Sequence, residues 1–198
     1  LVDVRLHQNL FEASKSGEEY DLTTIFEDSL VQLNPDRAVT FVDNHDTQRG
    51  QALESTVEEW FKPAAYALIL LRQEGLPCVF YGDYYGISGQ YAQQDFKDVL
   101  DRLLAIRKEL AYGEQTDYFD DPNCIGWIRS GANNQSPLAI VISNAKANSK
   151  IMFVGQEWAD QTFVDLLGNH PDQVTINAEG YGDFPVTERS LSVWGLAN

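Results

Sequence analysis

Hydrophobic and polar residues in the first part of the chain follow strand-like and helix-like patterns in turn. Apolar residues alternate with polar ones over 2–6, which predicts a strand at the start of the chain. Apolar runs at 38–42 and 76–81 predict two further strands. Helical spacing predicts helices over 57–74 and 95–111. Because the first of these helices joins two strands, we expect those strands to be parallel.

The pattern changes after residue 113. Short apolar runs bounded by turn-forming residues lie at 125–129, 138–143, 151–155, 162–167, 174–177 and 191–194. Many short strands at close spacing are typical of an antiparallel all-β module. We place the boundary in the polar link 113–123, which divides the chain into 1–115 and 116–198. The predicted fold class is α/β followed by all-β.

Composition limits the partners of the protein. The formal charge of −16 disfavours binding to DNA or RNA, because phosphate contacts require clusters of Lys and Arg. No apolar segment approaches the roughly 20 residues that cross a bilayer, so we expect no membrane partner. A neutral substrate such as a sugar polymer fits this composition better. The two cysteines, Cys78 and Cys124, lack the spacing of a disulfide framework or a zinc site.

The strongest chemical signal follows the apolar run 38–42, which ends in Asp43, Asn44, His45 and Asp46. A strand of this kind delivers polar side chains to its C-terminal edge, where the active sites of β/α barrels lie. A carboxylate there can stabilise an oxocarbenium-like transition state, and an imidazole can donate hydrogen bonds to a sugar. By spacing alone, an acidic loop that caps the next helix is the favoured interpretation, and catalysis is the alternative.

The stretch from Phe41 to Asp46 resembles the fourth conserved sequence region of the α-amylase family of glycoside hydrolases. Similarity to bacterial liquefying and intracellular α-amylases continues at 38–46, 51–55, 60–63, 65–70, 79–83, 117–120, 126–127, 174–177 and 179–182, and so covers essentially the whole chain. The resemblance implies that 1–115 is the C-terminal part of a (β/α)₈ TIM barrel, about strands 6 to 8. It implies an antiparallel Greek-key β-sandwich for 116–198.

The same resemblance implies a retaining, endo-acting hydrolase of α-1,4-glucans such as starch, glycogen or maltodextrin. Asp46 would stabilise the transition state, and His45 would contact the same sugar. Gln51 would touch the neighbouring glucose, with a helix-capping amide as the alternative. Nothing in the chain resembles the nucleophile and acid/base regions of the family, and the sequence lacks an initiator Met. We therefore expect a fragment that is inactive alone.

The resemblance also implies a calcium site in related enzymes. Glu18, Tyr20 and Pro122 would offer backbone oxygens, and Asn123 and Asn144 stand where calcium-dependent relatives carry Asp. Because hard cations prefer ionised oxygen ligands, two amides weaken such a site. We expect Ca²⁺ in the parent protein at most, and doubtful occupancy in this chain.

A second function remains open, namely a non-catalytic glycan-binding or scaffold module. Trp127, Trp158 and Trp194 would allow sugar binding at the surface of the β-module, although tryptophans of a sandwich usually fill its core. Tyr84 and Tyr85 follow the last barrel-like strand and would stack on sugar rings. Packing beneath the second domain is the alternative that we favour.

Two further expectations concern the chain as a whole. An incomplete barrel leaves strand edges and apolar helix faces uncovered, which predicts self-association of the fragment. Two free cysteines and the similarity to intracellular amylases favour the bacterial cytoplasm, with secretion as the alternative.

Overall fold

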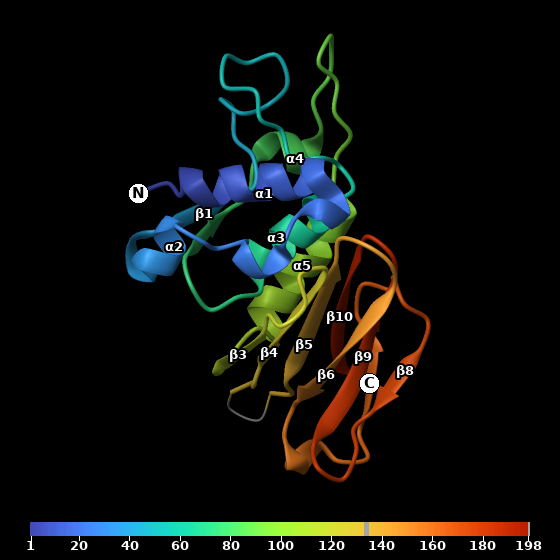
Figure 1. The fold of residues 1–198 in the computed structure, drawn as a ribbon. Coiled ribbons are helices and arrows are strands. Elements are labelled where there is room, and N and C mark those ends of the chain that lie inside the picture. The colour runs from blue at the N-terminus through green and yellow to red at the C-terminus, as the bar shows by residue number, and fades with distance from the viewer. Residues whose placement is uncertain (133–134, 198) are drawn as a thin grey trace. The chain divides into compact units, whose positions relative to one another are not determined.

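The chain divides into two units, and the computed structural model describes them over residues 1–132 and 135–197 (Figure 1). The first unit comprises 1–19 and 24–105, and the second comprises 20–23 and 106–198. Helix α5 (Lys97–Glu109) runs across this division, so the units separate earlier in the chain than the polar link 113–123. No helix in the described part of the chain is long and apolar enough to cross a bilayer.

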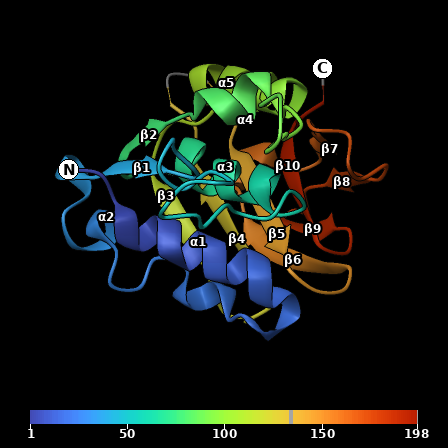
Figure 2. The same cartoon turned by 90° about the horizontal axis from the view of Figure 1, so that it is seen from above.

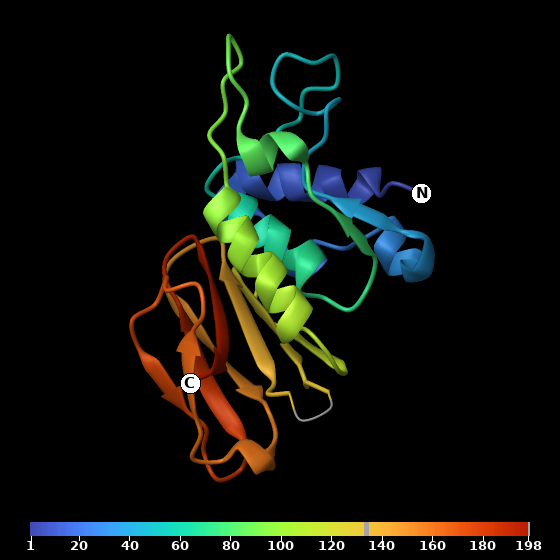
Figure 3. The ribbon, with the colours of Figure 1, turned by 180° about the vertical axis from the view of Figure 1, so that it is seen from behind.

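Parallel strands form the centre of the first unit. Strand β1 (Val39–Phe41) pairs with β2 (Leu76–Cys78), and helix α3 (Lys62–Leu70) connects them in sequence. Val2 forms a parallel bridge to Val39 on the other edge of β1. Figure 3 shows β1 and β2 as adjacent arrows. The parallel pairing expected from the strand-helix-strand pattern is confirmed.

The predicted strand over 2–6 is wrong beyond the bridge at Val2. Helix α1 (Val4–Ser16) begins two residues after this bridge and lies beside β1 (Figure 2). Asp3 is its N-cap and accepts a 3.0 Å hydrogen bond from the Leu6 amide. Leu6, Leu10 and Ala13 are buried at helical spacing, so the apparent alternation was the start of an amphipathic helix.

Short helical elements connect the remaining parts of the first unit. They are η1 (Gly17–Glu19), α2 (Leu30–Leu33), η3 (Pro35–Arg37) and α4 (Tyr81–Tyr85), while η2 (Leu22–Thr24) lies at the division between the units. Helix α3 is shorter than predicted and carries Pro63 in its first turn, where the missing N–H costs nothing. Its residues from 64 to 70 are buried on all sides, which makes the helix the core of this unit.

Antiparallel strands build the second unit. A six-stranded sheet has the order β3-β4-β5-β10-β7-β8, and β6 pairs with β9 in a separate two-stranded sheet. The bounds are β3 (Gln115–Tyr118), β4 (Cys124–Arg129), β5 (Leu138–Ser143), β6 (Asn148–Phe153), β7 (Thr162–Asp165), β8 (Gln173–Thr175), β9 (Tyr181–Val186) and β10 (Ser190–Leu196). A short 3₁₀ turn, η4 (Gln156–Trp158), follows β6. Each predicted run became a strand, and β3 and β9 were not predicted.

The β6–β9 pair covers one face of the larger sheet, with β4, β5 and β10 beneath it. Between the two layers lies an apolar cluster that includes Met152, Phe163, Phe184 and Trp194. Two sheets packed around one such core form a β-sandwich, as predicted.

Candidate functional site

The turn after β1 positions the residues of the predicted site. Asn44 Oδ1 accepts hydrogen bonds from the backbone amides of Asp46 and Thr47, at 2.9 and 3.0 Å. The hydroxyl of Thr47 accepts a 3.0 Å hydrogen bond from the Asn44 amide. These reciprocal bonds form a tight turn of the kind that Asn favours. The turn leaves the side chains of His45 and Asp46 pointing away from the core.

His45 and Asp46 lie together at the surface of this turn. His45 Nε2 is 3.5 Å from Asp46 Oδ1, and the two side chains are 82% and 59% exposed. Their polar atoms are therefore accessible to a ligand at the C-terminal end of a parallel strand, which is where β/α proteins place their chemistry.

Gln51 belongs to the same loop as His45 and Asp46. It is exposed, and its backbone amide donates a 3.3 Å hydrogen bond to the Gln48 carbonyl within a series of turns. Helix α3 begins only at Lys62, with Phe61 as its N-cap. The helix-capping alternative for Gln51 is therefore wrong, and contact with a glucose remains a prediction.

Beneath the turn lies a buried group of charges that the sequence analysis did not identify. Lys62 is fully buried, and its Nζ lies 2.8 Å from Asp43 Oδ2. The same ammonium donates a hydrogen bond to Asp83 Oδ1, and Asp83 is equally buried. Asp83 also accepts 2.6 Å hydrogen bonds from the Tyr66 hydroxyl and the Gln93 amide. One buried cation thus joins the carboxylates that follow β1 and β2.

Burial shifts the protonation of these groups. Desolvation is the main cause that raises the pKa of Asp43 to about 6, and the negative charge of Asp83 adds to it, while Lys62 opposes the rise. Desolvation and the adjacent Asp83 carboxylate raise the pKa of the Tyr66 phenol above its usual value, so that this group only donates. A proton on Asp43 is therefore lost close to neutral pH.

His7 packs against the strand that carries the turn. Its ring stacks on Phe41, with centroids 5.1 Å apart. Nδ1 donates to the Val42 carbonyl at 2.6 Å, and Nε2 lies 2.8 Å from the Ser55 hydroxyl. Desolvation lowers the pKa of His7, so the ring is neutral at pH 7 although Asp43 lies 4.0 Å away. His7 is therefore a buried hydrogen-bonding residue beneath the turn.

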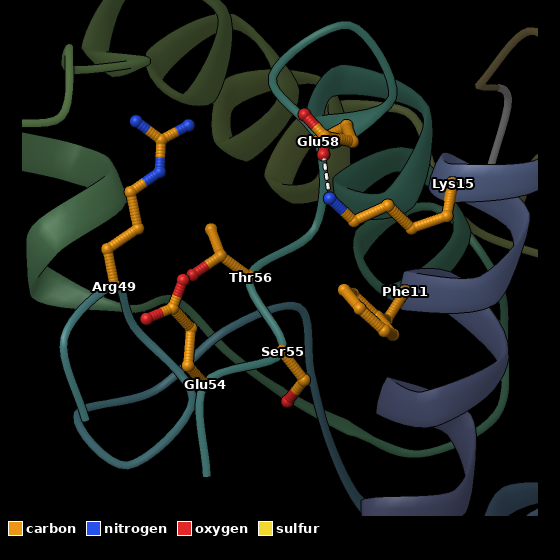
Figure 4. Close-up of a pocket in the computed structure, with 7 residues that line it drawn as sticks. All are labelled: Phe11, Lys15, Arg49, Glu54, Ser55, Thr56 and Glu58. Carbon is orange, nitrogen blue, oxygen red and sulfur yellow. Dashed lines mark hydrogen bonds and ion pairs between the residues drawn. The ribbon is translucent and has the colours of Figure 1, made fainter. Parts of the chain in front are cut away.

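A polar pocket of about 160 Å³ lies beside the loop (Figure 4). Its lining residues are Phe11, Lys15, Arg49, Glu54, Ser55, Thr56 and Glu58. Lys15 and Glu58 form an ion pair across one side, and Glu54 accepts a 2.7 Å hydrogen bond from the Gly50 amide. The charges of the pocket are balanced, and the pocket offers hydrogen-bonding groups rather than a surplus of one sign.

The residues suggested for calcium are divided between the two units. Glu18 is exposed in η1 of the first unit. Tyr20, Pro122, Asn123 and Asn144 belong to the second. The structure brings these four together.

Hydrogen bonds within the second unit occupy the oxygens that Tyr20, Pro122 and Asn144 would offer to a cation. Asn144 is fully buried and its Nδ2 donates a 2.8 Å hydrogen bond to the Tyr20 carbonyl. Its Oδ1 accepts a 2.9 Å bond from Asn123 Nδ2, and the Pro122 carbonyl accepts a 2.8 Å bond from the Leu22 amide. Since Tyr20 offers only a carbonyl oxygen there, the Asn144 amide must present its nitrogen, which repels a cation. Elsewhere in 1–132 and 135–197, no three acidic, His or Cys side chains gather to hold a metal.

The aromatic candidates have different surroundings. Tyr84 donates its hydroxyl to Asp101 at 2.5 Å. Tyr85 is 61% exposed and packs against the rings of Tyr81 and Tyr84, with ring centroids 4.7 Å away in each case.

The tryptophans of the sandwich do not form a sugar-binding surface. Trp127 and Trp194 are completely buried, and Trp158 packs against the core cluster. The sequence feature that favoured a separate glycan-binding module is thus a feature of the core.

The chain thus combines a strand-helix-strand unit, with an acidic turn at its C-terminal edge, and a β-sandwich. Residues 138–195 match the family model described as Alpha-amylase C-terminal. Over nearly its whole length the chain is homologous to the C-terminal part of bacterial α-amylases.

Three relatives show the extent of this similarity. The chain is 51% identical over 196 residues to an "Alpha-amylase" of Geobacillus stearothermophilus, covering 98% of the chain. It is 52% identical over 194 residues to a "Glucan 1,4-alpha-maltohexaosidase" of Bacillus sp. (strain 707), covering 97%, and 43% identical over 203 residues to a "Cytoplasmic alpha-amylase" of Escherichia coli (strain K12), covering 98%. The chain spans 36%, 37% and 41% of the length of these relatives.

Solved structures share the fold at low sequence identity. An Anoxybacillus α-amylase matches with a TM-score of 0.63 and 19% identity, over 96% of this chain and 46% of that one. An α-amylase I from Eisenia fetida, solved with maltohexaose, matches with a TM-score of 0.68 and 16% identity, over 97% of this chain and 48% of that one. These likenesses support the fold assignment.

Proposed function

We propose that this chain supplies one wall of the active site of a retaining, endo-acting α-1,4-glucan hydrolase. The observation that carries the proposal is the pair His45 and Asp46, exposed together on the turn that follows β1. In this role the Asp46 carboxylate binds the sugar at the cleavage point, and the His45 imidazole hydrogen-bonds to the same sugar. Gln51, exposed on the same loop, contacts the neighbouring glucose.

The chemistry assigned to Asp46 follows from the charge that develops during glycoside hydrolysis. The transition state is oxocarbenium-like, so positive charge grows on the sugar ring. A fixed carboxylate stabilises this charge more strongly than it binds the neutral substrate, and such differential binding lowers the barrier. Retaining hydrolysis also needs a nucleophilic Asp and an acid/base Glu, which we assign to residues outside 1–198.

The polar pocket beside the loop supports a carbohydrate ligand. Phe11 offers an aromatic face there, and Arg49 and Glu54 offer hydrogen-bonding groups. Neutral sugars bind to such mixtures of apolar and polar groups. Glycogen or maltodextrin in the bacterial cytoplasm is the substrate that we favour, because one close relative bears the name cytoplasmic α-amylase.

We further propose that no Ca²⁺ binds to the Tyr20, Pro122, Asn123 and Asn144 group. The hydrogen bonds already made by these residues support this proposal. The sheet edge formed by β1 and β2, with exposed Val2 and Leu76, supports self-association when residues 1–198 are produced alone.

The direct test is Asp46→Asn in the full natural protein that contains this chain. Loss of the negative charge should lower kcat about 100-fold or more, with a much smaller change in KM, because the interaction strengthens in the transition state. Steady-state hydrolysis of a maltooligosaccharide measures both constants. Asp172→Asn, at an exposed carboxylate of the second unit, is the matched control and should leave both unchanged.

Two results would contradict the proposal. One is a rise in KM at unchanged kcat for Asp46→Asn, which would assign the carboxylate to ground-state binding only. The other is glucan hydrolysis by purified residues 1–198 that disappears in the Asp46→Asn variant, since this would place the whole reaction within the chain.

A further inference from the structure

The loop that carries His45, Asp46 and Gln51 is fastened at both ends to a single carboxylate. Asp43 Oδ1 accepts 3.3 Å hydrogen bonds from the Thr47 hydroxyl, near the start of the loop, and from the Val57 amide, after its end. The Thr47 carbonyl accepts a 2.9 Å bond from the Ser55 amide, which closes the base of the loop. The course of residues 44–56 therefore depends on the place of Asp43.

Asp43 itself is fixed from the other side by Lys62. The ammonium lies 2.8 Å from Asp43 Oδ2 and also bonds to Asp83, while its charge lies over the ring of Phe96, 5.5 Å from the centroid. All three ionic side chains are 2% exposed or less. Asp83 is in turn held by Tyr66 and Gln93.

The charges of this cluster cost free energy of desolvation that a purely structural role would not require. Two carboxylates and one ammonium leave a net charge of −1 in the interior when all are ionised. Burying such charges is no more stabilising than an apolar core of the same volume. The cluster provides a fixed geometry, because Asp43 Oδ2 is ion-paired with Lys62 and the other carboxylate oxygens accept hydrogen bonds from defined donors.

We propose that Lys62 is a positioning residue for glucan hydrolysis, which aligns Asp46 and His45 by holding Asp43 at the base of their loop. The proposal rests on the function proposed above. Lys62 is buried and acts through Asp43, so it is not itself a catalytic residue. Misplacement of a catalytic group by about 1 Å can cost roughly 100-fold in rate, which gives the scale of the effect.

The ionisation of Asp43 connects this geometry to pH. The titratable groups that face it are Lys62 and Tyr66 from α3, Asp83 from α4 and His7 from α1. Lys62 opposes the rise in the Asp43 pKa, whereas Asp83 and burial promote it. Removing the ammonium therefore moves the titration of Asp43 to higher pH and leaves the loop without its ionised anchor near neutrality.

The test uses Lys62→Met and Lys62→Arg in the full natural protein, with Lys97→Met as the control. Lys97 forms an exposed ion pair with Asp101 and lies outside the cluster. For Lys62→Met we expect kcat on a maltooligosaccharide to fall about 10- to 100-fold with KM nearly constant. We also expect the acid limb of the kcat profile to move to higher pH. Lys62→Arg should restore part of both, and Lys97→Met should alter neither.

Folding is checked separately, because loss of a buried cation leaves two unpaired carboxylates. Activities are compared only where circular dichroism shows the variant to be folded. If Lys62→Met does not fold, Thr47→Val tests the link between Asp43 and the loop, since it removes the hydroxyl that donates to Asp43 and leaves the buried charges in place. The same change also removes the acceptor of the Asn44 amide, so an unchanged kcat is the decisive result. Thr47→Val should lower kcat about 10-fold with little change in Tm.

The outcomes separate this inference from the proposed function. An inactive wild-type protein, or an Asp46→Asn variant with wild-type kcat, would defeat the proposed function itself. The positioning role alone would be overturned if the wild type is active and the folded Lys62→Met variant keeps the kcat and the acid limb of the wild type. Where Lys62→Met does not fold, the same result for Thr47→Val would overturn it.

Discussion

Asn144 donates its side-chain amide to the backbone carbonyl of Tyr20 at 2.8 Å, across 124 positions of the chain. Both residues belong to the second unit, and the bond holds the segment 20–23 against it. A carboxylate at position 144 lacks the N–H that makes this bond. The Asn144 amide thus directs an N–H group to a position where a cation would need an oxygen ligand.

The first prediction concerns calcium. We expect the melting temperature of the full protein to change by less than about 1 °C on addition of millimolar Ca²⁺ or a chelator, apart from any metal site outside this chain. In Asn123→Asp/Asn144→Asp, two carboxylates face the carbonyls of Tyr20 and Pro122, so calcium should now stabilise the protein by mass action. Differential scanning calorimetry with and without Ca²⁺ measures the difference.

The variant Asn144→Ala provides the matched control for this change. It removes the hydrogen bond without adding charge, so it should lower the free energy of unfolding by about 1–3 kcal/mol and gain no response to Ca²⁺. A wild-type protein stabilised by micromolar Ca²⁺, with the response lost in Asn144→Ala, would contradict the metal-free interpretation.

The second prediction concerns pH and Asp43. Its folded-state pKa of about 6 lies above the ordinary value of 3.8, so folding favours the protonated form. This contribution to stability is complete below about pH 4 and is lost as the pH rises through about 6. In the wild type it should make the free energy of unfolding fall by roughly 1 kcal/mol per pH unit across that window, relative to Asp43→Asn.

Urea unfolding at several pH values between 4 and 7 checks the second prediction. Only the difference in slope between the two proteins is informative, because other groups titrate in both. Equal slopes for the wild type and Asp43→Asn would show that Asp43 titrates normally, and the assigned burial effect would be wrong.

The third prediction compares two glycines with positive φ in the second unit. A Cβ at Gly113, where φ is +80°, would collide with the Gly131 carbonyl oxygen, whereas a Cβ at Gly168, where φ is +72°, meets nothing within 4 Å. Gly168→Ala should therefore cost only the left-handed conformation, about 1–2 kcal/mol. Gly113→Ala should cost at least about 3 kcal/mol, since backbone must also move. Similar losses of unfolding free energy for the two variants, measured by chemical denaturation, would refute the clash at Gly113.

The fourth prediction concerns the role of the sandwich tryptophans. Trp194 is fully buried beside Phe184, with ring centroids 6.1 Å apart, and its indole donates a 2.9 Å hydrogen bond to the Ser192 hydroxyl. Trp194→Ala should lower the free energy of unfolding by about 3–5 kcal/mol. In affinity electrophoresis through glycogen, Trp194→Phe, which keeps most of the packing, should migrate as the wild type does. Weaker retardation of a folded Trp194→Phe would restore the glycan-binding role.

Local pattern predicted most of the strands of the second unit. The runs at 125–129 and 138–143 are apolar enough to be read directly, and they became β4 and β5. Strand β3 was missed because its residues are polar and partly exposed, and β9 because Gly182 and Pro185 interrupt its pattern. Such strands form because a neighbouring strand supplies hydrogen-bonding partners, which no local window contains.

The start of the chain shows that a local pattern can also predict a strand where a helix forms. A few alternating residues fit a strand and the first turn of an amphipathic helix equally well. Asp3 decides between them, since it caps α1 and also accepts hydrogen bonds from the Leu30 and Val31 amides. Those amides are distant in sequence, so the cap is a tertiary interaction.

The sequence by itself determined the chemistry available after β1, since its motif contains Asp43, Asn44, His45 and Asp46. Only the tertiary structure decided that Asp46 faces solvent and that Asp43 is buried against Lys62. The physical reason is that burial of an ionised carboxylate costs free energy unless a cation and hydrogen-bond donors lie next to it in the core. Those partners come from α3 and from the far end of the loop, and folding alone brings them to Asp43.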